Sequence, residues 1–240
     1  MNRLIAIGDI HGCAHALDTV LDAIQPTSDD TIVILGDFID VGRDTNSVID
    51  RCLQLQHECE LVTIRGNHEE MMLNALNDTG LKHQWDELGG YYTLNSYGFL
   101  SDIDGIPEPH IDFIQQTLDH YESETHIFTH ACYRPELPMV DQPEHVLRWE
   151  MLEPPYPQPH FSGKTVLVGH TEQKSCEVLD FGHLICLDTY CREFGWLSAM
   201  DVLSGTLWQA NRWGALRNGN ESVENQRVAV SYLKNSAISS

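Results

Sequence analysis

The sequence predicts an α/β fold in which a sheet is covered by helices on its outer faces. Two observations support this prediction. Short apolar runs of β-forming residues alternate with amphipathic helical segments early in the chain, and several of these runs end in a glycine followed by a polar residue. With 240 residues, 42% of them hydrophobic, the chain can bury a sizeable core, and we expect one domain.

The first part of the chain reads as successive βα units. A strand at 4–7 precedes a helix, and the same order follows for strand 31–35 with helix 47–55 and for strand 61–64 with helix 69–76. The apolar face of the first helix is formed by Ala16, Leu17, Val20, Leu21 and Ile24. This repetition predicts one side of an α/β sheet.

The middle of the chain has a looser pattern. We expect a helical insertion over about 81–122, which includes an apolar-periodic stretch at 111–118. Strands resume at 126–129 and 165–168, separated by the proline-rich connection PPYPQPHFSG, whose prolines forbid regular ladders.

The last part of the chain is predicted to contain short strands followed by a tail. Their close spacing is typical of an antiparallel meander; they lie at 176–179, 184–187, 196–200 and 206–209. From Gly214 onward polar residues dominate, so we expect one folded domain at 1–213 and a polar tail, frayed or disordered, at 214–240.

The charge balance limits the classes of partner. Lys and Arg number 14 against 36 Asp and Glu, which gives a formal net charge of −22. Such an acidic chain is repelled by nucleic-acid backbones and by anionic membranes, so we expect neither as a partner. Metal cations are favoured instead.

Cysteine usage and the N-terminal sequence predict a cytoplasmic protein. The seven cysteines are scattered and form no CxxC pair, so neither a disulfide framework nor a zinc ribbon is indicated. The opening MNRLIAIGDIHG has only four consecutive apolar residues before its first glycine, too few for a signal peptide or a membrane span. The oligomeric state stays open.

Polar side chains with metal-ligating groups follow five of the predicted strands. They are Asp9 with His11, Asp37, Asn67 with His68, His130, and His170. Ligands of open α/β sheets bind beyond the carboxyl ends of the strands, so these residues are expected to converge. A mixed set of oxygen and nitrogen ligands suits Mn²⁺, Fe or Zn²⁺ better than an ion that prefers thiolates.

The cluster has more ligands than one tetrahedral ion needs. We expect two divalent ions with Asp37 bridging them, Asp9 and His11 on one ion, and Asn67, His130 and His170 on the other. A single Gly-Asp pair after a strand is usually only a turn, but a turn explains the five strand ends together poorly.

These residues carry a resemblance to a known family. GDIHG, GDFIDVGRD, GNHEE, the histidine of THACYRP and GHT resemble the five blocks of the calcineurin-like metallophosphoesterases, in particular the Ser/Thr protein phosphatase branch. The stretch RGNHEEMML resembles bacterial and phage members of that branch, whose relatives include enzymes that cleave diadenosine tetraphosphate. The resemblance covers about residues 3–210 and implies a four-layer α/β/β/α sandwich with two divalent ions, Mn²⁺ first and Fe or Zn²⁺ as alternatives.

The resemblance also implies roles beyond the metal ligands. His68 is expected to be the general acid that protonates the leaving group, and Asp40 is expected to orient its imidazole. The motif GDxxDRG should place an arginine at position 41, where this chain has Val41 and Arg43 follows two residues later.

Arginines that match phosphate-binding positions complete the predicted site. Arg43, Arg65 and Arg148 are the candidates for binding the substrate phosphate, although Arg65 is as readily a structural partner of the many carboxylates.

We expect hydrolysis of phosphomonoesters, with a phosphorylated Ser/Thr protein or a small phosphoester as substrate. The alternatives are a dinucleoside polyphosphate hydrolase and a non-catalytic binding module. The intact ligand set argues against the module, and the shortage of cations argues against a polyphosphate.

Overall fold

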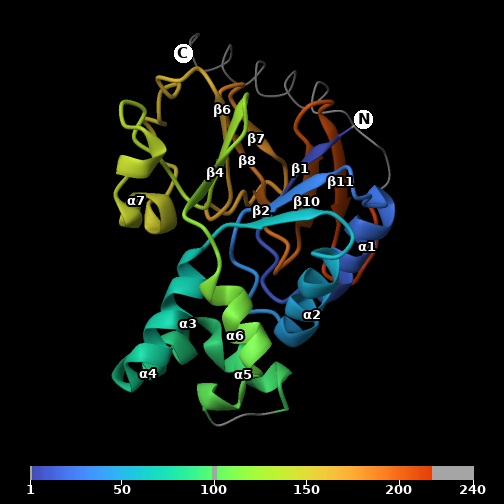
Figure 1. Ribbon diagram of the computed structural model, residues 1–240, viewed down its shortest axis with the longest axis vertical. Coiled ribbons are helices and arrows are strands. Elements are labelled where there is room, and N and C mark those ends of the chain that lie inside the picture. Colours follow the sequence, from blue (N-terminus) through green and yellow to red (C-terminus); the bar gives the residue numbers. More distant parts are fainter. Residues whose placement is uncertain (1, 99–101, 218–240) are drawn as a thin grey trace.

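The computed structural model describes residues 2–98 and 102–217. These residues form two mixed β-sheets that pack face to face, with helices outside both (Figure 1). Residues 218–240, most of the predicted polar tail, lie outside the described residues, so the boundary predicted at residue 213 stays a prediction.

The first sheet has the strand order β11, β10, β1, β2, β3, and β9 pairs with β10. Its strands are β1 (Leu4–Ile7), β2 (Thr31–Ile34), β3 (Glu60–Thr63), β9 (Asp188–Thr189), β10 (Trp196–Asp201) and β11 (Thr206–Ala210). Strands β1 to β3 run parallel, whereas β10 is antiparallel to both β1 and β11. The central strand β1 is wholly buried, as expected for a sheet covered on both faces.

The second sheet has the strand order β4, β5, β6, β8, β7. Its strands are β4 (His120–Glu122), β5 (His126–Thr129), β6 (Thr165–Val168), β7 (Leu179–Asp180) and β8 (Leu184–Cys186). Strands β5, β6 and β8 run parallel, and the two outer strands are antiparallel to their neighbours.

The antiparallel meander predicted for the last four strands is wrong. Strands β7 and β8 belong to the second sheet, whereas β10 and β11 form a hairpin in the first. The chain crosses between the sheets in the short connection after Cys186. Closely spaced apolar runs suit a hairpin and a crossover equally, so their spacing alone does not tell which neighbours they will pair with.

Alternate residues of β1 and β2 face opposite layers. Ile5, Ile7, Ile32 and Ile34 pack with the helices, and Leu4, Ala6, Val33 and Leu35 pack against the second sheet. The far face of the second sheet is covered in turn by α7 (Glu144–Trp149), whose Val146 and Leu147 lie against Ile127 and Val166. The predicted α/β/β/α layer order is therefore confirmed.

Three helices follow the parallel strands of the first sheet. They are α1 (Ala14–Ile24), α2 (Thr45–Leu55) and α3 (Asn67–Asn77). The predicted apolar face of α1 is buried in full in the core between helices and sheet. None of the helices in the described part of the chain combines the length and apolar character needed to cross a bilayer.

Between α3 and the second sheet the described chain is mainly helical. It contains η1 (Thr79–Leu81), α4 (Lys82–Trp85), the π-helix η2 (Asp86–Gly90), α5 (Tyr91–Ser96), η3 (Ile103–Gly105) and α6 (Glu108–Gln115). Figure 1 shows α4, α5 and α6 gathered beside α3 at one end of the molecule. The last residues of the predicted insertion, 120–122, form β4 instead. A short 3-10 helix, η4 (Met139–Asp141), precedes α7.

Candidate metal centre

The loops after β1 and β2 are fastened to each other by backbone hydrogen bonds. The amides of Ile10 and His11 both donate to the carbonyl of Asp37, at 3.1 and 2.8 Å, and the amide of Gly12 donates to the carbonyl of Phe38 at 2.9 Å. His11 and Asp37 have φ angles of 45° and 50°, in the left-handed region that non-glycine residues seldom adopt. The paired loops hold both side chains in this conformation.

Close backbone approach at the site requires glycine. Gly36 has a φ of +106°, and a Cβ atom there would lie 2.7 Å from Nδ1 of His130 and 2.8 Å from the amide nitrogen of Gly66. A Cβ atom at Gly169 would collide with the carboxylate of Asp9. The glycines that end the strands therefore let ligand-bearing loops from both sheets meet.

Asp37 lies between two groups of potential ligands. Its Oδ2 is 3.5 Å from Nε2 of His11, and its Oδ1 is 3.4 Å from Nε2 of His130. Ligand atoms of His11, Asp37 and His68 lie within 4.8 Å of one another, and so do those of Asp37, His130 and His170. The structure thus brings together residues from both sheets around one carboxylate.

Asn67 and Asp9 complete the cluster. Oδ1 of Asn67 is 3.1 Å from Nε2 of His130 and 3.1 Å from Nδ1 of His170. Oδ2 of Asp9 accepts from the amide of His170 at 2.9 Å, whereas its buried Oδ1 has no hydrogen-bond partner among the described residues. A buried carboxylate oxygen without a hydrogen-bond partner, next to a cluster of potential ligands, fits a cation.

The histidines are held in the neutral form that binds metals. Burial lowers the pKa of His11 to about 3 and that of His170 to about 4, and it also lowers the pKa of His130. Nδ1 of His130 lies 2.8 Å from the carbonyl of Leu35, which leaves Nε2 to face Asp37. Neutral imidazoles with one nitrogen directed into the cluster are suitable ligands.

The carboxylates of the cluster repel one another. Burial, together with the nearby Asp188 and Asp37, raises the pKa of Asp9 well above its usual range. Asp37 behaves differently: burial favours its neutral form, but the surrounding histidines, His130 foremost, hold its pKa below the ordinary value. Divalent cations would relieve this repulsion, so the residues present fit a metal centre.

His68 lies beside the cluster and is oriented by a buried carboxylate. Its Nδ1 is 2.8 Å from Oδ2 of Asp40, which also accepts from Nε1 of Trp85 at 2.9 Å, while Thr93 Oγ1 donates to the other oxygen at 2.7 Å. Although burial opposes it, the charges of Asp37 and Asp40 raise the pKa of His68 to about 9. These charges favour the protonated form of His68, and its ring lies edge-to-face against that of His11 at the edge of the cluster.

Four residues of the site lie outside the sequence-predicted set. Glu69 joins the loops after β2 and β3, because its carboxylate accepts from the amides of Asp37, Phe38 and Gly66, each at 2.9 Å. Glu69 stands three residues after the N-cap Gly66, the position at which a glutamate typically accepts from backbone amides at the start of a helix, and this pattern could have identified it. Asp188 follows the strand-like run LIC, the same strand-end signal as the predicted ligands, whereas Trp85 and Thr93 lie in the predicted helical insertion and follow no predicted strand.

The three candidate phosphate-binding arginines line two different pockets, Arg65 and Arg148 in one and Arg43 in the other. Arg148 is buried and contacts Glu70, Asp119 and Glu144. Arg65 donates to the carbonyls of Gln115 and Thr117 and to the hydroxyl of Thr117. Arg43 is exposed and lines a separate pocket together with Val41.

The comparisons with sequences place the chain among phosphoesterases. A family model described as calcineurin-like phosphoesterase matches residues 2–195. The chain is 40% identical over 70 residues to Serine/threonine-protein phosphatase 1 of Salmonella typhimurium, which covers 29% of this chain and 31% of that one. It is 34% identical over 88 residues to the symmetrical Bis(5'-nucleosyl)-tetraphosphatase of Paracidovorax citrulli, covering 36% and 31%. The matched segments thus span less than a third of these relatives.

Solved structures share the fold over most of the chain. A candidate diadenosine tetraphosphatase superimposes with a TM-score of 0.65 at 22% identity, covering 90% of this chain and 95% of that one. A cold-active protein tyrosine phosphatase superimposes with a TM-score of 0.61 at 16% identity, covering 90% and 78%. The family model spans most of the chain, and the fold of the chain and its cluster of potential metal ligands agree with that match. This protein therefore belongs to the calcineurin-like phosphoesterase family.

Proposed function

We propose that the protein is a metal-dependent phosphatase whose centre holds two divalent cations. The observation that carries this proposal is the shared position of Asp37, which belongs to both groups of potential ligands. Asp9 and His11 would complete one ligand set, and the other would be completed by three residues, Asn67, His130 and His170. Family membership supports divalent ions, and the oxygen and nitrogen donors favour Mn²⁺, with Fe or Zn²⁺ as alternatives.

Each side chain of the site has a part in phosphoester hydrolysis. When bound, two divalent cations supply Lewis acidity that activates water and neutralises charge on the phosphate. His68 protonates the leaving oxygen from Nε2, because Nδ1 is held by Asp40. Asp40 keeps the ring in this orientation and stabilises its charge, and it is held in turn by Trp85 and Thr93.

The proposed substrate is a phosphomonoester, with a phosphorylated Ser/Thr protein as the first choice. A relative named Serine/threonine-protein phosphatase supports it, and relatives named Bis(5'-nucleosyl)-tetraphosphatase support the alternative of a dinucleoside polyphosphate. The acidic charge of the chain disfavours the alternative. All seven cysteines are free thiols, which fits the proposed cytoplasmic location.

Metal analysis and turnover of Asp37→Asn test the centre. We expect wild type to bind two equivalents of Mn²⁺ and to hydrolyse p-nitrophenyl phosphate, and Asp37→Asn to lose both properties because an amide bridges two cations poorly. Asp29→Asn is the matched control, since it removes an equal charge from an exposed position before β2. Near wild-type turnover of Asp37→Asn with two ions bound would refute the proposal.

Replacement of His68 by Asn tests the general acid. We expect intact metal content and a loss in kcat of about 10²- to 10⁴-fold for alkyl phosphates, with a smaller loss for nitrophenyl phosphate, whose leaving group needs less protonation. His57→Asn, at an exposed position in the turn after α2, is the control. Equal losses for the two substrates would remove His68 from this role.

The two substrate classes are separated by a panel of phosphopeptides, p-nitrophenyl phosphate, its bis ester and diadenosine tetraphosphate. We expect phosphopeptides to be preferred, and a preference for the dinucleotide would favour the alternative function.

A further inference from the structure

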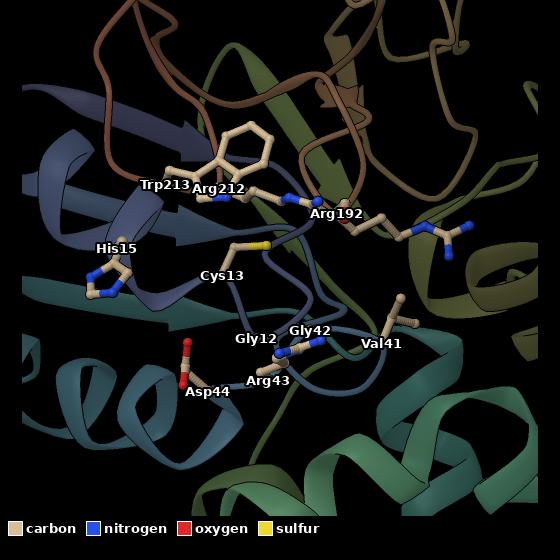
Figure 2. Close-up of a pocket in the computed structure, with 10 residues that line it drawn as sticks. All are labelled: Gly12, Cys13, His15, Val41, Gly42, Arg43, Asp44, Arg192, Arg212 and Trp213. Atoms are coloured by element: carbon tan, nitrogen blue, oxygen red, sulfur yellow. Dashed lines mark hydrogen bonds between the residues drawn. The ribbon is translucent and has the colours of Figure 1, made fainter.

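A cavity opens beside the metal centre. It has a volume of about 400 Å³ and is lined on one side by Val41 and Arg43 and on the other by Arg192, Arg212 and Trp213, as Figure 2 shows. We call it the arginine pocket. Its two sides come from distant parts of the sequence, the loop after β2 and the segments around β10 and β11.

The arginine pocket adjoins the general-acid side of the centre. Two of its lining residues, Gly12 and Val41, directly follow His11 and Asp40. Asp40 orients His68, and the rings of His11 and His68 are 4.9 Å apart in an edge-to-face arrangement. A leaving group protonated by His68 would therefore depart toward this pocket.

Two of the three guanidinium groups of this pocket lack the carboxylate partner that most described cationic side chains have. Most described Lys and Arg side chains form ion pairs with carboxylates; they are Arg3, Arg51, Lys82, Arg134, Arg148, Lys164, Arg192 and Arg217. Within residues 2–98 and 102–217, the side chains of Arg43 and Arg212 form no ion pair, and neither do those of Arg65 and Lys174, which do not line this pocket. Arg212 donates to the carbonyl of Arg192 at 2.9 Å and lies 4.5 Å above the ring of Trp213.

The remaining charges leave the pocket positive. Arg192 is paired with Glu172, and Asp44 is the one carboxylate in the pocket lining. Three guanidinium groups thus face two carboxylates. A locally positive pocket is unusual in a chain with a net charge of −22, where exposed cations have many acidic partners to choose from.

We propose that the arginine pocket binds a second phosphate group of the substrate, carried by the leaving group. This inference rests on the proposed function, because it takes the reacting phosphate to lie at the metal centre and His68 to face the leaving group. Guanidinium groups bind phosphate through charge-assisted, often paired hydrogen bonds. A pocket of this volume holds a phosphate together with the short linker that joins it to the reacting ester. The substrate class is therefore a phosphomonoester with a further phosphate on its alcohol portion.

The test compares propyl phosphate with 1,3-propanediol bisphosphate, which differ by one phosphate. For the Mn²⁺-loaded protein we expect kcat/KM to be about tenfold higher for the bisphosphate, as a charge-assisted contact contributes roughly this factor. Arg212→Gln should lower kcat/KM for the bisphosphate toward the value for propyl phosphate and leave the latter unchanged. Lys164→Gln, which removes an equal charge before β6, should change neither.

Two outcomes would overturn the inference. One is equal kcat/KM values for the two substrates in wild type, and the other is an equal loss on both in Arg212→Gln, which would place Arg212 at the reacting phosphate. Thermal unfolding separates these outcomes from failure of the proposed function. If neither substrate is hydrolysed, 1,3-propanediol bisphosphate should still raise the Tm of the Mn²⁺-loaded wild type more than that of Arg212→Gln, and an equal rise in both would refute the pocket.

Discussion

Two pockets of similar volume contain arginines, and they use these side chains in opposite ways. The arginine pocket, of about 400 Å³, presents Arg43 and Arg212 without carboxylate partners. The other, of about 390 Å³, lies between α3 and α7 and is lined by Arg65 and Arg148. Here Nη2 of Arg148 is 2.5 Å from Asp119, while Nη1 also contacts Glu70.

The difference shows that the role of an arginine depends on whether the N–H groups of its guanidinium already donate to protein acceptors or remain open to solvent. We call the pocket between α3 and α7 the paired pocket. Here the guanidinium groups of Arg148 and Arg65 donate hydrogen bonds to carboxylates and carbonyls of neighbouring elements, and so they connect those elements. In the arginine pocket the donors of Arg43 face solvent, where an anion can reach them. The following predictions test this division between structural and ligand-binding arginines.

The largest expected effect is on stability, in the paired pocket. Arg148→Ala should lower the free energy of unfolding by about 3 kcal/mol, because it leaves the carboxylates of Glu70 and Asp119 without their buried partner. Urea denaturation measures this change. Lys164→Ala, which breaks an ion pair with Glu122, is the control and should cost less than about 1 kcal/mol.

The phosphate-binding role predicted for Arg148 requires the opposite result. In that case kcat/KM for a monophosphate would fall about tenfold or more while stability changed little.

The ion pair of Arg3 with Asp30, which lines neither pocket, shows how much a paired arginine contributes to stability. Asp30 is buried and accepts from Arg3 Nε at 2.9 Å; hydrogen bonds from Arg3 and Thr27 hold its pKa below the ordinary value. A lowered pKa stabilises the fold above about pH 4, and this stabilisation is lost as the pH falls further. Asp30→Asn should therefore cost about 2 kcal/mol at pH 7, and the difference from wild type should shrink below pH 4. A pH-independent difference in urea denaturation would contradict this.

Val41→Arg tests the arginine pocket at its border with the centre. The introduced guanidinium would stand next to Asp40 and would reach a phosphate held between the metal ligands, so kcat/KM for p-nitrophenyl phosphate should rise about tenfold. Val41 also has a φ of 64°, which a β-branched residue adopts only under strain, and its replacement relieves part of that strain. Val140→Arg, at an exposed position in η4, is the control. A gain confined to KM would limit the new contact to ground-state binding.

The smallest expected effects concern Arg65 and Arg212. Arg65→Met should cost about 1 kcal/mol of unfolding free energy, because the carbonyls of Gln115 and Thr117 regain water as partners when the guanidinium is removed. Arg212→Gln in the arginine pocket should change stability by less than about 0.5 kcal/mol. If both variants cost the same, the distinction between the two pockets would fail.

The sequence predicted the positions of short side chains at strand ends better than the contacts of long arginine side chains. Asp9 and Asp37 were predictable neighbours, because the carboxyl ends of parallel strands place short side chains at the same edge of a sheet. His170 follows a strand of the second sheet and reaches them because the corresponding edges of the two sheets meet. The partners of Arg148 and Arg65 could not be predicted from their motifs, since a long side chain can turn toward any of several acceptors, and their phosphate-binding role stays a prediction. Pairing of the last strands was missed because it depends on which sheet has a free edge.

The interleaving of the chain through both sheets has a consequence for biosynthesis. His11, Asp37 and His68 leave the ribosome early, but β1 lies between β2 and β10, and β10 is made only near residue 200. His130 and His170, on the other sheet, are also late. A nascent chain thus holds all six proposed ligands before its central strand has both neighbours, because β10 follows the last of them in the sequence. Loading of the complete centre must therefore follow synthesis of nearly the whole domain.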